Sequence, residues 1–101
     1  MIITVTARHL EVTPTIKSHA EEKARKLLKY YDLIKEIEVI LDGSSGKQMK
    51  VEIIVNAEHR NMFVGTVEGE NLHACIDMAT HKLERQLTEH KDKHRNRKHP
   101  S

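Results

Sequence analysis

The 101-residue chain has the length of one domain, enough to bury roughly 65% of its unfolded surface without disulfides or metals. Its 38% hydrophobic and 32% charged residues are typical of a soluble protein with a modest core, and no segment is apolar for long enough to span a membrane. The net charge of +2 is unevenly distributed, because residues 82–101 carry seven Lys or Arg and three Asp or Glu, which leaves a net of −2 on residues 1–81.

The N-terminus and the single cysteine indicate the cellular compartment. The first residues, MIITVTAR, lack the basic and then apolar layout of a secretory signal. Cys75 has no second cysteine in the chain with which to form a disulfide, which fits a reducing environment. We therefore expect a cytoplasmic protein in which Cys75 is a small core residue rather than a nucleophile.

The first part of the chain predicts a strand followed by a helix. Residues 2–8 alternate hydrophobic and polar side chains and are rich in β-branched types, which favours a strand. Thr13 followed by Pro14 is typical of a helix start, with Thr13 as the N-cap and Pro14 at the first helical position. We predict a helix over residues 14–31, whose apolar stripe consists of Ile16, Ala20, Ala24, Leu27, Leu28 and Tyr31.

Three more strands are predicted in the middle of the chain. Residues 36–42 and 49–57 both alternate between hydrophobic and polar side chains, and the intervening segment, GSSGKQ, has the composition of a hairpin turn. A second turn near residues 59–61 leads to a strand over residues 62–68. Gly69 ends that strand, and Asn71 is the expected N-cap of the next helix, although Gly69 or Glu70 could also serve.

A long helix is predicted over residues 72–99, with two different halves. Its first half has an apolar stripe at spacings of three or four residues, made of Leu72, Ile76, Ala79, Leu83 and Leu87. The positions that would continue the stripe are His90 and His94, so we expect the last turns to extend past the body of the protein into solvent. Residues 88–99 then form a basic end.

The order of elements is β-α-β-β-β-α, without repeats or an internal boundary, and it predicts one α+β domain over residues 1–101. The expected architecture is a four-stranded, mostly antiparallel sheet with both helices packed on one face. The other face should be exposed, acidic on balance and free of aromatic residues; its expected members are Thr4, Thr6, Glu36, Glu38, Lys50, Glu52, Asn56 and Glu58. This composition excludes the base-stacking sheet of an RNA-recognition motif, so a nucleic acid should contact the helices.

Motifs for catalysis or metal binding are lacking. The sequence has no Ser-His-Asp spacing, no HExxH and no phosphate loop ending in GK[ST], so we expect neither an enzyme nor a cofactor. His90 and His94 are one helical turn apart, but Cys75 lies roughly 22 Å away along a helix, so we expect solvated histidines and no metal site. Asp77 is interpreted as a surface carboxylate stabilised by the start of its helix.

The basic end indicates a polyanionic partner, with nucleic acid favoured over an anionic membrane. The alternative is a solvated helix end whose cations only keep the protein soluble and complement the helix dipole. The density of positive charge in the last turns exceeds what dipole complementation uses, which favours the first interpretation.

The segments VTPTIKSHAEEKARKLLKYY and ACIDMATHKLERQLTEHKDK resemble the short ribosome hibernation promoting factors and ribosome-associated translation inhibitors, also called sigma-54 modulation proteins. The resemblance implies a fold similar to the double-stranded-RNA-binding domain. It also implies binding to the decoding region of the small ribosomal subunit, in competition with messenger and transfer RNA, and silencing of idle ribosomes in stationary phase or stress.

The resemblance also implies which residues contact ribosomal RNA. These are Lys23 and Lys26 on the first helix and Lys82, Arg85, Lys91 and Lys93 on the second, to which the basic end adds Arg95. Glu89 departs from the family pattern, because many relatives are basic at this position, so one phosphate contact could be missing.

We expect neither the C-terminal dimerisation domain of the long family members nor the acidic extension of the inhibitor branch, and hence a monomer in free solution. Two alternatives stay open. One is a stand-alone binder of double-stranded RNA or DNA, which would bind naked duplex as tightly as ribosomes. The other is a protein-interaction module that modulates a transcription factor, which would bind without a steep salt dependence.

Overall fold

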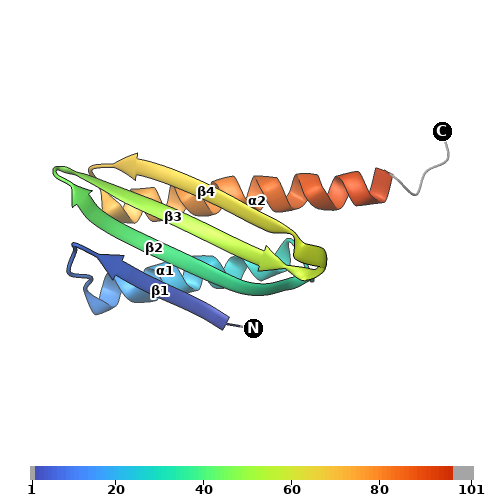
Figure 1. The fold of residues 1–101 in the computed structure, drawn as a ribbon, viewed down its shortest axis with the longest axis horizontal. Coiled ribbons are helices and arrows are strands. Elements are labelled where there is room, and N and C mark those ends of the chain that lie inside the picture. Colours follow the sequence, from blue (N-terminus) through green and yellow to red (C-terminus); the bar gives the residue numbers. More distant parts are fainter. Residues whose placement is uncertain (1, 97–101) are drawn as a thin grey trace.

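A four-stranded sheet carries both helices on one of its faces in the computed structural model (Figure 1). The structure describes the backbone of residues 2–96 and the side chains of residues 2–91 apart from Ser45. The elements are β1 (Ile2–Arg8), α1 (Pro14–Lys26), the 3-10 turn η1 (Leu27–Lys29), β2 (Ile34–Ser45), β3 (Gln48–Ala57), the 3-10 turn η2 (Glu58–Arg60), β4 (Met62–Gly69) and α2 (Leu72–Asn96). The predicted order of elements is confirmed. The last three residues of the predicted second helix, 97–99, lie outside the described part of the chain.

The strands lie in the order β1-β2-β3-β4, so β1 and β4 form the two edges of the sheet. β1 is parallel to β2, with α1 as the crossover between them, and the other two pairs are antiparallel. β2 and β3 form a hairpin whose turn includes Gly46 at a φ of 74°, a conformation that glycine adopts without steric cost. The predicted α+β class and mostly antiparallel sheet are therefore confirmed.

Both helices begin at the predicted caps. The Thr13 hydroxyl oxygen accepts a hydrogen bond from the backbone N–H of Ile16 at 3.2 Å, and the Asn71 side-chain oxygen accepts one from Ala74 at 2.9 Å. The first helix ends earlier than predicted, because the chain tightens into η1 after Lys26. The last carbonyl groups of an α-helix lack partners within the helix, and the tighter hydrogen bonds of a 3-10 turn can satisfy them. This explains why the α-helix ends at Lys26 although the chain continues to turn.

The core lies between the helices and the sheet. Most of the α2 stripe is buried as predicted: Ile76, Leu83 and Leu87 are fully covered, whereas Leu72 at its start is half-buried. α2 approaches β4 closely at Gly65, where an added Cβ atom would overlap the Cδ2 atom of Leu83. Cys75 is also buried, which confirms its expected place in the core. Burial raises the pKa of the Cys75 thiol, since the thiolate would lose its hydration.

His90, the position that follows Leu87 on the apolar stripe of α2, packs against other side chains. The expectation that His90 is solvated is therefore wrong. The His90 ring lies edge-on to Tyr31 and Phe63, with centroid distances of 5.3 and 5.2 Å. Its Nε2 atom is 3.4 Å from the Tyr31 hydroxyl. The two aromatic rings contact each other edge-on, with centroids 6.3 Å apart, and together provide a surface that an imidazole can cover. Beyond this contact α2 extends past the end of the sheet, as predicted (Figure 1).

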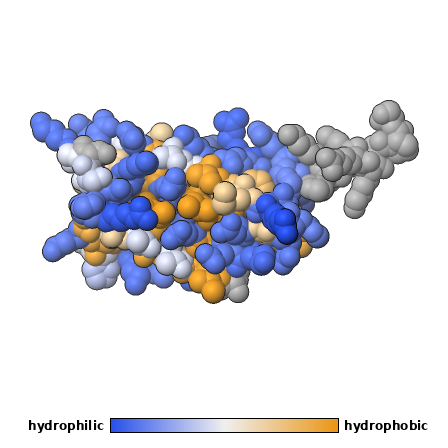
Figure 2. All heavy atoms as spheres, viewed as in Figure 1, coloured by the Kyte–Doolittle hydropathy of each residue, from blue (hydrophilic) through white to orange (hydrophobic). Residues whose placement is uncertain are grey.

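The open face of the sheet is more hydrophobic than predicted. Figure 2 shows hydrophobic residues in the middle of this face, surrounded by polar ones. The strand register places Ile54 between Glu38 and Val64, and Val64 and Met62 on the edge strand are 40% and 64% exposed. The predicted members of this face included neither Ile54 of β3 nor any position of β4, which is why the prediction overestimated its polarity.

Candidate nucleic-acid interface

The cationic residues predicted to contact RNA lie on α1 and α2, which cover the same face of the sheet (Figure 1). Lys26, Arg85 and Lys91 are exposed, so their charges are available to a partner. Lys93 and Arg95 lie on α2, but their side chains are outside the described part of the chain. The structure therefore supplies cations from both helices on one side of the protein.

Lys23 is not a free cation. Its Nζ atom lies 3.7 Å from Oδ1 of Asp77 on α2, and its side chain is 30% exposed. An ion pair that is this accessible is worth little in water, so an incoming phosphate can compete for the ammonium group. Lys23 thus combines a helix-to-helix contact with a potential contact to a polyanion.

Lys82 lies on the other side of α2, against the edge of the sheet. Its Nζ atom donates a hydrogen bond to the carbonyl oxygen of Thr66 at 2.9 Å. Four residues further along the helix, the amide of Gln86 donates to the carbonyl oxygen of Val64 at 2.8 Å. These bonds satisfy carbonyl groups on the free edge of β4, so Lys82 has a structural contact that sequence reasoning did not anticipate.

A surface groove of about 320 Å³ separates the chain after η1 from α2. Tyr30 forms one wall, and Arg85 lies on α2 together with Glu84 and Glu89. An aromatic ring and a guanidinium group can stack on a base or bind a phosphate, whereas the two carboxylates oppose a phosphate. Glu89, the expected departure from the family pattern, is therefore adjacent to a predicted RNA-binding residue.

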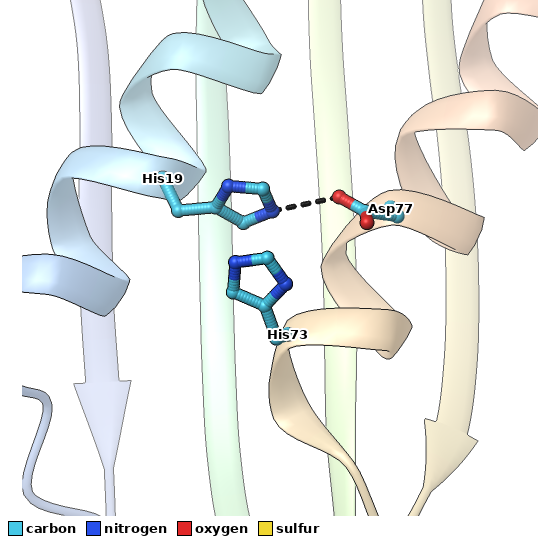
Figure 3. Close-up of side chains that lie close together, drawn as sticks. All are labelled: His19, His73 and Asp77. Atoms are coloured by element: carbon cyan, nitrogen blue, oxygen red, sulfur yellow. Dashed lines mark hydrogen bonds and ion pairs between the residues drawn. The ribbon is translucent and has the colours of Figure 1, made fainter.

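Sequence reasoning missed a cluster of three side chains between the two helices (Figure 3). His19 of α1 places its Nε2 atom 2.7 Å from Oδ1 of Asp77, and its ring stacks on that of His73 with centroids 3.6 Å apart. Asp77 is therefore part of an inter-helix contact and not simply a surface carboxylate. The spacing of His73 and Asp77, one helical turn apart, was visible in the sequence, but the position of His19 was not.

Among residues 2–96 no helix is long and apolar enough to cross a membrane. Near the end of β2, the backbone N–H of Ser44 donates to the Asp42 carboxylate at 2.8 Å and thereby lowers the pKa of that group.

Comparison with known proteins identifies a family. The sequence model of the protein family described as sigma 54 modulation protein / S30EA ribosomal protein matches residues 3–95 of this chain. A ribosome hibernation promotion factor of Bacillus subtilis is 36% identical over 91 residues, which cover 88% of this chain but only 48% of the Bacillus protein. Ribosome hibernation promoting factors of Azotobacter vinelandii and Escherichia coli strain K12 are 32% and 31% identical, and the matches cover 92% of this chain and 85% and 96% of those proteins.

Two solved structures share the fold. The N-terminal domain of Thermus thermophilus Protein Y superimposes with a TM-score of 0.76 at 31% identity, over 88% of this chain and 98% of that one. A ribosomal subunit interface protein from Coxiella burnetii gives a TM-score of 0.80 at 22% identity, over 91% of this chain and 99% of that one.

Proposed function

Because the chain belongs to the sigma 54 modulation protein / S30EA ribosomal protein family, we propose that it binds the small ribosomal subunit at the decoding region and silences idle ribosomes in stationary phase or stress. The observation that carries the proposal is the family match over residues 3–95, which spans both helices and their exposed cations. The relatives described above are named for ribosome hibernation, which supports the same function for this chain.

The proposed contact surface is the outer side of the two helices. Lys26, Arg85 and Lys91 are exposed there and can pair with phosphates of ribosomal RNA, and Lys23 can exchange Asp77 for a phosphate. Lys93 and Arg95 are proposed to extend this surface along the last turns of α2. The open sheet face lacks an aromatic platform among the described residues, which supports phosphate and shape recognition over base stacking.

The proposed mechanism is steric exclusion. A folded domain lodged at the decoding region would overlap messenger RNA and the anticodon arms of transfer RNA, so it would inhibit without a chemical step. We propose that the free protein is a monomer and that one copy occupies each subunit. Inhibition should then be competitive with initiation.

A competition experiment tests the proposal. Initiator transfer RNA and message, loaded first on the small subunit, should slow association of the protein, and excess protein should block new initiation complexes while leaving preformed ones largely intact. Simultaneous binding of the protein and initiator transfer RNA to one subunit would contradict the decoding-region assignment.

A second experiment separates the two other candidate functions. A stand-alone duplex binder would bind naked double-stranded RNA as tightly as it binds small subunits. A modulator of a transcription factor would associate with its partner without the steep salt dependence that phosphate contacts produce. Cosedimentation with small subunits across a salt series, with duplex RNA as competitor, distinguishes all three.

A further inference from the structure

We propose that His19, His73 and Asp77 form a binding site for a divalent transition metal ion, with Zn²⁺ as the best match, which would link α1 to α2. The three ligand atoms lie within 4.8 Å of one another (Figure 3). The proposal concerns the free protein and is independent of ribosome binding.

The donor set favours zinc over the hard cations. Two imidazole nitrogens and one carboxylate oxygen are typical ligands of Zn²⁺ and also suit Co²⁺ or Ni²⁺, whereas Mg²⁺ and Ca²⁺ prefer oxygen ligands alone. Three protein ligands leave one tetrahedral position open. A hollow next to the cluster is lined by His19, His73 and Glu22, so a water molecule or the Glu22 carboxylate could fill that position.

The scaffold holds the ligands on two packed helices. His73 and Asp77 are one turn apart on α2, so both project from the same side of that helix. His19 reaches them from α1, and its side chain is only 16% exposed, which restricts its orientation. Ligands on two helices that share a core need little chain movement to close around an ion.

One side chain must rotate before an ion can bind. The imidazole rings of His19 and His73 are stacked with an angle of 17° between their planes, and the nitrogen lone pairs lie in those planes. Two nearly parallel rings cannot direct lone pairs at one ion, so one ring must turn. His73 is exposed, and its ring can turn without disturbing the core.

Two features of the site oppose metal binding and thereby make the proposal testable. The ion must replace the hydrogen bond of 2.7 Å between His19 and Asp77. The ammonium group of Lys23, 3.7 Å from Asp77, repels a cation, so Lys23→Gln should tighten zinc binding.

Isothermal titration of the chelator-treated full chain with ZnCl₂ tests the site. The parent should bind one equivalent with an affinity that His73→Ala and Asp77→Asn each weaken by more than about tenfold. His81→Ala is the matched control, because His81 is an exposed histidine on the same helix that lies beside Glu84 rather than in the cluster. Its zinc affinity should equal that of the parent. Circular dichroism verifies that each variant is folded.

A second readout distinguishes a link between the helices from loose surface binding. Zinc that bridges α1 and α2 should raise the melting temperature of the parent and of His81→Ala but not of His73→Ala. The proposal is overturned if the parent takes up no zinc. It is also overturned if His73→Ala and Asp77→Asn bind zinc as tightly as the parent, since the ion would then lie on other histidines.

Discussion

The ammonium group of Lys82 donates a hydrogen bond of 2.9 Å to the carbonyl oxygen of Thr66, which attaches α2 to the free edge of β4. An unpaired strand edge is a template for association with another chain, and side chains that cover it reduce this risk. Gln86 makes the equivalent contact to Val64 one turn later. A residue expected only to bind RNA therefore also protects the sheet.

Lys82→Ala should lower stability as well as ribosome binding. The loss of an exposed hydrogen bond is expected to cost about 0.5–1.5 kcal/mol of unfolding free energy. Lys91→Ala is the control, because Lys91 is exposed on the same helix and should affect binding alone. Thermal melting measures the difference, and identical melting temperatures for the two variants would show that the Thr66 contact contributes nothing.

The salt dependence of ribosome binding should report the number of phosphate contacts. Each of Arg85→Ala and Lys91→Ala should weaken cosedimentation with small subunits and reduce the slope of log affinity against log salt by about one. Lys47→Ala, an exposed lysine in the β2–β3 turn, is the matched control and should leave the slope unchanged. Unaltered binding of a variant with Lys82, Arg85, Lys91 and Lys93 all changed to Ala would rule out α2 as the interface.

Leu83→Ala should separate folding from binding. Leu83 is fully buried, so its truncation is expected to cost roughly 2–5 kcal/mol of unfolding free energy. Met78→Ala, on the exposed side of the same helix, should cost much less. Chemical denaturation provides both values. If Leu83→Ala were as stable as the parent but failed to bind ribosomes, the orientation of α2 described above would be wrong.

Gly65→Ala should destabilise the contact between α2 and β4. The new methyl group would overlap the Cδ2 atom of Leu83, so the Leu83 side chain or α2 itself must shift, at an expected cost of about 1–3 kcal/mol. Leu83→Ala removes the overlapping atoms, and the double variant should therefore be more stable than the sum of the two single effects implies. Strict additivity in a double-mutant cycle would show that the two residues do not compete for the same space.

Cys75 should react slowly with thiol reagents in the folded protein. It is 3% exposed, and burial raises its thiol pKa, so both access and the thiolate fraction are reduced. Unfolding in urea exposes the thiol and restores its ordinary pKa, and the reaction with a chromogenic disulfide should then become much faster. Because the chain has a single cysteine, the whole signal comes from Cys75. Equal rates with and without urea would contradict its burial.

The sequence alone was sufficient for the order of the helices and strands and for most of the core, although not for the end of the first helix. Alternation of side chains located the strands, the three-to-four spacing located the stripe of α2, and Thr13 and Asn71 marked the helix starts. These features depend on interactions between residues close together in the chain, so local pattern and local chemistry determine them. The concentration of positive charge in the last turns of α2 was likewise evident from composition.

Tertiary structure alone decided which distant side chains meet. His90 packs on Tyr31 and Phe63 and is not solvated, and Lys82 bonds to a carbonyl group of the edge strand. His19 reaches Asp77 across 58 positions in the sequence. Such contacts depend on the distance and rotation between packed helices and on the strand register, which no periodicity within one element specifies. That is why the sequence indicated a charged helical surface, whereas the inter-helix cluster became visible only in the folded chain.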